Sequence, residues 1–423
     1  MEITIISLAL LVFMAHVFAA MFVKTRLPDV LPLMLLGIII GPVFQIVSPA
    51  DFGMVDKVFT RVLLIVILFE SGLGIKISQI RLTWTQSLRL TLACFTVMTA
   101  VIAALARFAL GLPSVYAFAL GCILASNSFA VIIPLISKLN ISANIKTVLL
   151  SESTLGSVLS IAGAVTILQM PQIDTFGFGR IGAKIIYMFL LSFAVGAGAA
   201  IFWTMVLHRI RKLENSIFLT PAFVMIVYSV CEACGADGAI SAFIFGIIAG
   251  NIRVIRSFKA LRFIGKLTRD TASNAFNEVE KSFFGEIVFL LRTFFFVYIG
   301  ICMHIGSRHS MLYGLLFTAV IFITRAVVAN LTLAKSVSRL DAAAASAMAP
   351  KGLVTAVLAS LAAQSGAGAL QDIVYSVIFF SILFATLMSF CIEKGYCAGI
   401  VAFVFRRHQE AAAPSERNNH AGL

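Results

Sequence analysis

Charged residues are scarce in this sequence. They make up 12% of the 423 residues, whereas 60% are hydrophobic, and the mean hydropathy is +1.03. Soluble domains carry charged residues at about twice this frequency, so a soluble globular protein is excluded. Apolar runs of roughly 20 residues, the length of one membrane-spanning helix, recur along almost the whole chain. The sequence therefore predicts an all-α polytopic membrane protein, because helices satisfy their own backbone hydrogen bonds in lipid.

Groups that support enzymatic or metal chemistry are also few. The seven cysteines are scattered and odd in number. Cys231 and Cys234 form a C-x-x-C, but this pair lies in an apolar segment without a second pair, so a zinc or redox centre is not expected. None of the six histidines is well placed for chemistry, and we find no nucleophile–base set or phosphate-binding loop. We expect no enzymatic activity, no cofactor and no metal.

The net charge of +13 comes mostly from basic residues in short loops. Such residues indicate topology rather than nucleic-acid binding, because lysine and arginine are enriched on the cytoplasmic side of membrane proteins. Basic residues cluster after the odd-numbered predicted spans and are few or absent after the even-numbered ones. This alternation predicts a multi-pass protein of the cell membrane with its N-terminus outside and its C-terminus in the cytoplasm. The predicted spans, about thirteen in number, are 3–22, 30–48, 59–77, 86–111, 115–136, 147–168, 182–207, 217–233, 237–251, 284–304, 311–333, 341–364 and 371–391.

Residues 1–405 are predicted to form one transmembrane domain, with a cytoplasmic connection between its halves at 252–282. Basic residues alternate there with aliphatic and aromatic ones. This spacing suits an amphipathic helix on the inner leaflet as well as a plain connector. Residues 406–423 are polar, and we expect a short disordered cytoplasmic tail.

Two predicted spans are interrupted near their middles. The fifth contains Ser126-Asn127-Ser128, and the twelfth contains Ala349-Pro350-Lys351-Gly352. Pro350 has no backbone N–H to donate, and Gly352 lets the chain turn. Because the two spans are seven places apart in the order, an odd offset, the interruptions occupy matching places in two oppositely oriented halves. This pattern favours an inverted-repeat transporter whose site lies where two broken helices cross, and a simple proline kink is the alternative for the second.

A series of motifs between about residues 5 and 390 is similar to those of one family. The stretches are Leu27-Pro28 through Gly37 to Gly41-Pro42, Leu68 to Leu73, Glu152-Ser153, Glu232 to Asn251, and Ala349 to Val354. Together and in this order they resemble the monovalent cation:proton antiporter superfamily, the sodium/proton-exchanger type of membrane domain. The resemblance implies inverted repeats with two broken, crossing helices, alternating access and a homodimer.

The sequence departs from that family at its ion-binding positions. Where cation-exchanging members typically carry Thr-Asp-Pro, this chain has Ser126, Asn127 and Ser128. Where they carry Asn-Asp on the following helix, it has Gly156 and Ser157. Amide and hydroxyl oxygens can coordinate a cation but do not titrate near neutral pH. Competition between proton and cation for a carboxylate must therefore occur elsewhere or be absent.

The remaining membrane-embedded acids have several interpretations each. The resemblance implies that Glu152, beside Ser153, pairs with Arg325. Asp237 is expected to cap a helix, with a displaced coupling acid as the alternative. Glu232 fits either an orienting role in the core or a span end. Glu70 is interpreted as an interfacial charge at a cytoplasmic span end.

Lys351 is the most informative embedded base because it lies in the second interruption. It either exchanges a proton or carries a permanent charge that offsets the carbonyl ends of two half-helices. With Asn127 neutral, the crossing would be neutral or positive rather than acidic. This favours an anion or an uncharged solute more than the family pattern does.

Three functions fit the sequence. The first is a monovalent cation (Na⁺ or K⁺):proton antiporter in the lipid bilayer, with Ser126, Asn127, Ser128, Glu152, Ser153, Ser157 and Lys351 as candidate site residues, Arg325, Glu232 and Asp237 as ion-pairing or coupling residues, and Pro350 and Gly352 as the helix break. The second is a transporter of the same fold that handles an anion or a neutral solute, with Lys351 at the site. The third is a transport-inactive membrane subunit or sensor.

Overall fold

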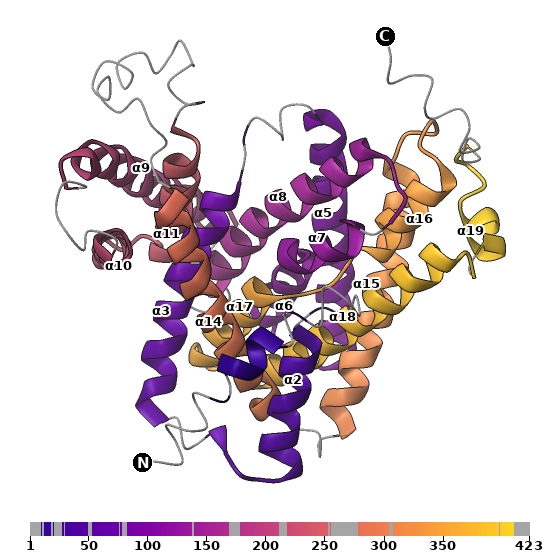
Figure 1. The fold of residues 1–423 in the computed structure, drawn as a ribbon, viewed down its shortest axis with the longest axis horizontal. Helices are drawn as coiled ribbons and strands as arrows, with labels where there is room; N and C mark the ends of the chain where they lie inside the picture. Colours follow the sequence, from indigo (N-terminus) through magenta and orange to yellow (C-terminus); the bar gives the residue numbers. More distant parts are fainter. Residues whose placement is uncertain are drawn as a thin grey trace.

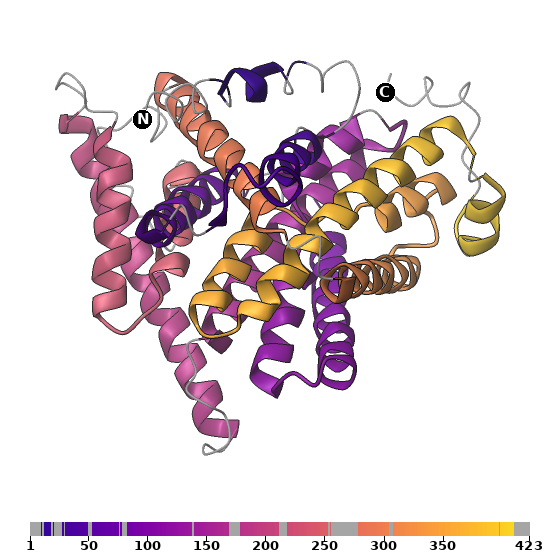
Figure 2. The same ribbon diagram turned by 90° about the horizontal axis from the view of Figure 1, so that it is seen from below.

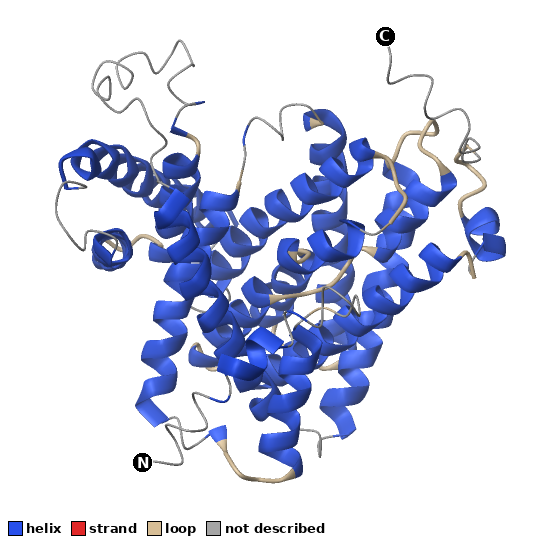
Figure 3. Cartoon of the chain, in the orientation of Figure 1, coloured by secondary structure: helices blue, strands red, loops and turns tan. Residues whose placement is uncertain are grey.

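A computed structural model describes residues 10, 12–17, 20, 28, 30–49, 53–75, 77, 83–137, 139–168, 178–210, 218–252, 254, 278–303, 308–396 and 398–409. Within these ranges the chain is helical and has no strand beyond one isolated bridge between Ser338 and Gln409 (Figure 3). The predicted fold class is therefore confirmed. Seven described helical segments are long and apolar enough to cross a membrane, by length and composition, if the broken segment Ser114–Ser137 is counted as one.

The helices divide into two groups (Figure 1), one of them mostly on the left of the view and the other mostly in the middle and on the right. One group contains α2 (Val30–Ile38) with the π-helical turn η1 (Ile39–Val43), α3 (Gly53–Gly74), α9 (Phe178–Ile210), α10 (Leu219–Ala233), α11 (Gly238–Gly250) and α14 (Glu278–Cys302). The other contains α5 (Trp84–Ala109), α6 (Ser114–Ala125), α7 (Phe129–Ser137), α8 (Ala143–Leu168), α15 (Arg308–Thr332), α16 (Arg339–Ala347), α17 (Leu353–Gln364), α18 (Gly368–Lys394) and the short α19 (Ala398–Val404). In a perpendicular view, α9 and α10 lie towards one end of the molecule and α19 lies at the other (Figure 2).

Helix packing repeats between the two halves of the chain. Helix α5 contacts α6 and α8, and α6 contacts α8; in the same way α15 contacts α16 and α18, and α16 contacts α18. The pair α2–α14 likewise corresponds to the pair α11–α3. Gly37 packs against Gly300 in the first of these crossings, and Gly72 against Gly246 in the second, where a Cβ on any of the four would overlap the partner backbone. The internal repeat predicted from the two interruptions is thus present in the packing.

Both predicted interruptions separate two helices. Ser126 to Ser128 lies between α6 and α7, and Met348 to Gly352 lies between α16 and α17. Ser126 is extended, with φ −82° and ψ 156°, and Gly352 is extended as well. Both breaks lie in the interior of the second helix group, so that the freed backbone groups meet protein rather than lipid.

The ends of the predicted domain differ in how the structure describes them. The predicted connection at 252–282 lies mostly outside the described residues, and α14 begins within it at Glu278. At the C-terminus, α19 was not predicted. Residues 406–409, which we expected to belong to the disordered tail, instead lie against the connection between α15 and α16. The rest of that tail lies outside the described residues.

Candidate functional site

The two helix breaks contact each other directly. The backbone N–H of Ser128 donates to the carbonyl of Pro350 at 2.8 Å. Gly352 is needed for this approach, because a Cβ at that position would overlap the Ser128 side chain. On the other side of the break, the Lys351 N–H donates to Ser381 Oγ on α18 at 3.0 Å. The crossing is therefore fixed by backbone groups that regular helices would use internally.

Lys351 reaches from the second break to the first. Its side chain is fully buried, and Nζ donates to the Ser126 carbonyl at 2.9 Å and to Asn127 Oδ1 at 3.0 Å. Ser126 is the residue that follows α6, so the ammonium group lies at the carbonyl end of that helix. A cation there is favoured by the helix dipole.

Asn127 joins Lys351 to a buried ion pair. Its Nδ2 donates to Glu152 Oε1 at 3.2 Å. Glu152 accepts two hydrogen bonds from Arg325, one from Nη1 and one from Nη2, the latter at 2.7 Å. Arg325 also donates from Nε to the Ala345 carbonyl on α16 at 3.0 Å. The pair expected between Glu152 and Arg325 is thus present, and it ties α8 to α15 and α16.

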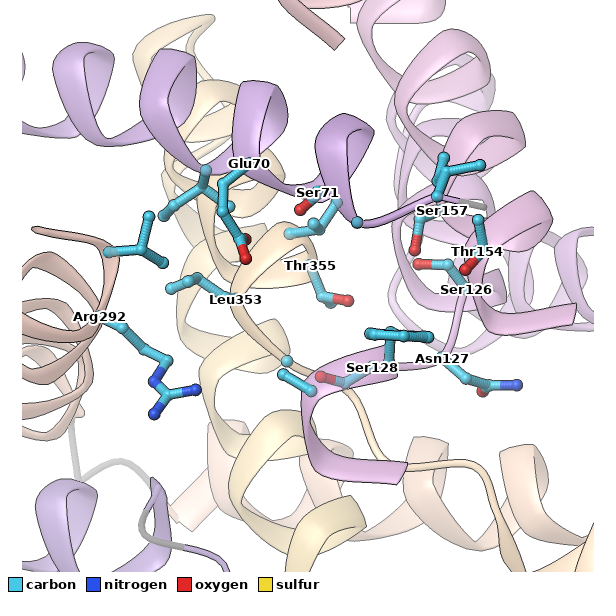
Figure 4. Close-up of a pocket in the computed structure, with 18 of the residues that line it drawn as sticks. Glu70, Ser71, Ser126, Asn127, Ser128, Thr154, Ser157, Arg292, Leu353 and Thr355 are labelled. Carbon is cyan, nitrogen blue, oxygen red and sulfur yellow. The ribbon is translucent and has the colours of Figure 1, made fainter. Parts of the chain in front are cut away.

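A cavity of about 330 Å³ reaches this crossing from the side of the other helix group. It lies between α3, α11 and α14 on one side and the first break, α8 and α17 on the other. Its polar lining residues are Glu70, Ser71, Ser126, Asn127, Ser128, Thr154, Ser157, Arg292 and Thr355. The close-up shows Glu70 and Arg292 on one side of this space and the serines of the break and of α8 on the other (Figure 4).

Glu70 and Arg292 are site residues that the sequence interpretation missed. Both are half-buried, and Arg292 is close enough for its positive charge to act on the Glu70 carboxylate. A signal was available, because Ile67, Glu70, Ser71 and Gly74 follow the i, i+3, i+4, i+7 spacing of one helix face, and all four line the cavity. Two polar residues and one glycine on a single face of an apolar helix indicate that this face lines a polar cavity and does not contact lipid.

The candidate residues chosen from sequence fall into three places. Ser126, Asn127, Ser128 and Ser157 line the cavity, whereas Glu152, Ser153 and Lys351 lie buried behind it. The Asn127 amide points away from Glu70 (Figure 4), towards its partners Glu152 and Lys351. The hydroxyls of Ser153 and Ser157 both donate to carbonyls one turn earlier on α8, at 2.8 Å, which leaves the Ser157 oxygen as an acceptor on the cavity wall.

Glu232, in the last turn of α10, and Asp237, which directly precedes α11, occupy the third place. Asp237 caps α11, accepting from the Ile240 N–H at 2.9 Å. Glu232 Oε1 accepts from the Gly238 N–H at 2.8 Å. Both carboxylates thus bind free N–H groups at the start of one helix, and neither lines the cavity.

Two broken helices that meet within a repeated bundle, beside a cavity, are the arrangement expected of a secondary transporter with inverted repeats. A family model described as "Sodium/hydrogen exchanger, transmembrane" matches residues 8–393, and the chain belongs to this family of transport proteins. The family assignment and the apolar helices together establish a multi-pass membrane protein.

Solved structures agree with this assignment. The sodium proton antiporter MjNhaP1 from Methanocaldococcus jannaschii at pH 8 matches with a TM-score of 0.67 and 22% identity, covering 95% of this chain and 99% of that one. An electron-microscopy structure of MjNhaP1 matches with a TM-score of 0.67 and 20% identity, covering 97% of this chain and 100% of the other. At these identities the likeness shows the fold. No curated protein matches the sequence.

Proposed function

We propose that this protein is a secondary active transporter that exchanges a monovalent cation, Na⁺ or K⁺, for protons by alternating access. Membership of the sodium/hydrogen exchanger family supports the class of transport. The difficulty is the absence of aspartates at positions 127 and 157. A coupled exchanger needs at least one group that binds a proton and a cation in alternation, and a buried amide cannot do so.

The observation that carries the proposal is the position of Glu70. It is the only carboxylate among the residues that line the described cavity. In contrast, Glu152 is 3% exposed and its two oxygens are taken by Arg325 and Asn127. We assign to Glu70 the alternate binding of proton and cation, because a carboxylate on the wall of an accessible cavity can be reached by both.

Oxygen atoms opposite Glu70 complete a site for a hard cation. The hydroxyls of Ser128, Thr154, Ser157 and Thr355 line the same cavity. Alkali cations share with Ca²⁺ and Mg²⁺ a preference for oxygen ligands. In this scheme the Lys351–Asn127–Glu152–Arg325 cluster keeps its charges during transport and holds the two broken helices at their crossing.

The cavity's position between the two helix groups supports alternating access. We propose that the group of α5–α8 and α15–α18 moves against the group of α2, α3, α9–α11 and α14, opening the cavity to each side in turn. The predicted homodimer would be formed through the group that contains α2, α3, α9–α11 and α14. The C-terminus is proposed to face the cytoplasm, as the distribution of basic loops predicts.

Arg292 and the net charge of the buried cluster support a second candidate function, transport of an anion. Arg292 lines the cavity beside Glu70. Behind the wall, Arg325 and a protonated Lys351 would supply two positive charges against one negative charge on Glu152. An anion bound by Arg292 and the hydroxyls would be attracted by this excess. Lys351 itself does not line the cavity, so its predicted direct contact with a solute is not part of this proposal.

Flux measurements in reconstituted vesicles separate these functions. A preformed proton gradient that collapses on addition of Na⁺ or K⁺ supports the first. Glu70→Gln should abolish this exchange, and Glu70→Asp should retain part of it, because the shorter side chain keeps the carboxylate. Glu286→Gln is the matched control, since Glu286 is an exposed acid on α14, and it should exchange like the wild type.

Three other outcomes would contradict cation exchange through Glu70. Exchange that persists in Glu70→Gln would assign coupling to another group. Flux that depends on the anion present, and is lost in Arg292→Gln rather than in Glu70→Gln, would favour the second function. Absence of flux over a broad panel of ions and solutes, from correctly folded protein, would favour a transport-inactive subunit.

A further inference from the structure

The charged residues that line the cavity balance each other. Among the lining residues of the described cavity, Glu70 on α3 and Arg292 on α14 are the only two with a formal charge. Both are half-buried, and Arg292 is close enough for its positive charge to act on the Glu70 carboxylate. While Glu70 is ionised, the cavity wall therefore carries one negative and one positive charge.

The charge on Arg292 is permanent and its position is restrained. A guanidinium group stays protonated in proteins, so this charge does not depend on the proton that the cavity exchanges. The Cζ atom of Arg292 lies 5.8 Å from the centre of the Phe289 ring, three residues earlier on α14. An aromatic face attracts a cation. The guanidinium is therefore held on the α14 wall, on the same side of the cavity as Glu70 (Figure 4).

The charges behind the wall do not reverse this balance. Glu152 and Arg325 form an ion pair whose two charges cancel. Lys351 is fully buried and donates to Asn127, and it adds a further positive charge when it is protonated. A cation in the cavity is therefore attracted by one carboxylate, that of Glu70, and repelled by at least one fixed positive charge.

The type of ligand alone does not distinguish a monovalent from a divalent cation. Apart from the Glu70 carboxylate, the proposed ligands are the hydroxyls of Ser128, Thr154, Ser157 and Thr355. Ca²⁺ and Mg²⁺ bind the same kinds of oxygen. A carboxylate attracts a double charge twice as strongly as a single one. A site with these oxygens and no compensating positive charge would thus prefer a divalent cation.

We propose that Arg292 makes this site selective for monovalent cations, a proposal that rests on the proposed cation exchange at Glu70. A proton or a monovalent cation on Glu70 leaves the cavity wall with one net positive charge, so the two loaded states carry the same charge. A divalent cation would leave two. The repulsion from Arg292 also counts once for a monovalent cation and twice for a divalent one.

Titration calorimetry of the purified full-length protein tests this proposal, with Na⁺ and Mn²⁺ as the probes. One unit charge about 10 Å away, at an effective dielectric constant of about 20, changes the affinity for a monovalent ion roughly tenfold. In Arg292→Gln we therefore expect the Kd for Na⁺ to fall about tenfold and the Kd for Mn²⁺ to fall about a hundredfold, the square of the first factor.

Three further variants show whether charge is the cause. Arg292→Lys restores the positive charge, so the selectivity against Mn²⁺ should return. Arg61→Gln removes an exposed arginine from the same helix as Glu70, and it should bind both ions like the wild type. Glu70→Gln combined with Arg292→Gln should lose the high affinity for Mn²⁺, because the carboxylate that binds this ion is gone.

Equal factors for the two ions in Arg292→Gln would overturn the proposal, because a change of shape affects both ions alike. Absence of Mn²⁺ binding to that variant, or Mn²⁺ binding that survives the loss of Glu70, would overturn it as well. The wild type alone is also decisive if Arg292→Gln fails to fold, since Mn²⁺ should bind the wild type more weakly than Na⁺ does.

The result is separate from the outcome of the flux measurements. Exchange that persists in Glu70→Gln contradicts the proposed coupling by Glu70 and leaves the two binding factors unaffected. Equal binding factors contradict the role of Arg292 and leave the exchange by the wild type unaffected.

Discussion

Two combinations of glutamate and arginine occupy the membrane region, and they differ in their surroundings. Glu152 and Arg325 are almost completely buried and form a bidentate pair behind the crossing. Glu70 and Arg292 are half-buried and line the cavity. A carboxylate enclosed by fixed donors cannot change partners without leaving buried charges unpaired. The same two residue types can therefore hold a structure together in one place and be available to a solute in another.

The two positions without aspartate differ in the same way. Asn127 uses its amide nitrogen for Glu152 and its amide oxygen for Lys351, so it connects an anion to a cation. Ser157 lies on the cavity wall with only a helical hydrogen bond to Ser153. Asn127 therefore belongs with the buried pair of Glu152 and Arg325, whereas Ser157 belongs with Glu70 and Arg292 on the cavity wall. Four variants test this division, and they follow in order of expected effect.

Glu152→Gln should have the largest effect, and it should be an effect on stability. The substitution leaves Arg325 charged and 0% exposed without an ionised partner, a change that typically costs about 3–5 kcal/mol. Thermal unfolding in detergent should show a clearly lower midpoint, whereas Glu70→Gln should unfold like the wild type. A combined Glu152→Leu and Arg325→Met variant should recover most of the stability, because it removes both charges. Normal stability of Glu152→Gln together with loss of exchange would instead make Glu152 a coupling group.

Asn127→Asp should have the second largest effect, again on stability. Aspartate keeps the contact with Lys351, but it cannot donate to Glu152 and places a second carboxylate beside it. We expect a loss of about 1–3 kcal/mol, the range for a buried group left without its hydrogen bond, and no gain in cation exchange, although the substitution restores the family's residue type. Increased exchange by this variant, at unchanged stability, would show that the amide is a substituted ion ligand.

Ser157→Asp restores the family's other aspartate, and here we expect a gain. The side chain faces the cavity across from Glu70, so a second carboxylate would join the cation's ligands. The concentration of Na⁺ or K⁺ at half-maximal exchange should fall about tenfold, corresponding to ~1.4 kcal/mol, with a small change in unfolding temperature. The opposite result, weaker cation dependence and stronger anion dependence, would favour the second proposed function.

Much of the fold could be predicted from the sequence because it depends on local pattern. Long apolar runs specify the spans, and the predicted spans overlap every described helix from α2 to α18, whereas α19 was not predicted. Pro350 and Gly352 predict the second break, because proline lacks a backbone N–H and glycine lacks a Cβ, and both changes disturb the helix within one turn. The Asp237 cap and the repeat of the two breaks have local signals as well.

The sequence could not predict which candidate residues belong to the buried cluster and which line the cavity, because the residues that contact each other there are distant in sequence. Asn127 acquires its partners from Glu152 and Lys351, which are 25 and 224 positions away. Glu70 was interpreted as an interfacial charge from its place at the end of an apolar run, whereas the packing of α3 against α11 and α17 turns its face to the cavity. Likewise, residues 406–409 were assigned to a disordered tail, since their partners between Asn330 and Arg339 lie 69 to 78 positions earlier.

Ser157→Ala should have the smallest effect, and it is the finest test of which oxygens the solute contacts. The hydroxyl donates along α8 to Ser153 at 2.8 Å, a bond whose loss changes stability by less than about 0.5 kcal/mol at such sites. If the oxygen also coordinates the cation, half-maximal exchange should require about two- to fivefold more Na⁺ or K⁺, as for one neutral ligand. Ser153→Ala is the matched control, because Ser153 makes the same type of helical bond but is fully buried behind the wall. Equal effects of the two substitutions would mean that both act through the helix alone, and the cation site would then have to lie closer to Glu70 than to α8.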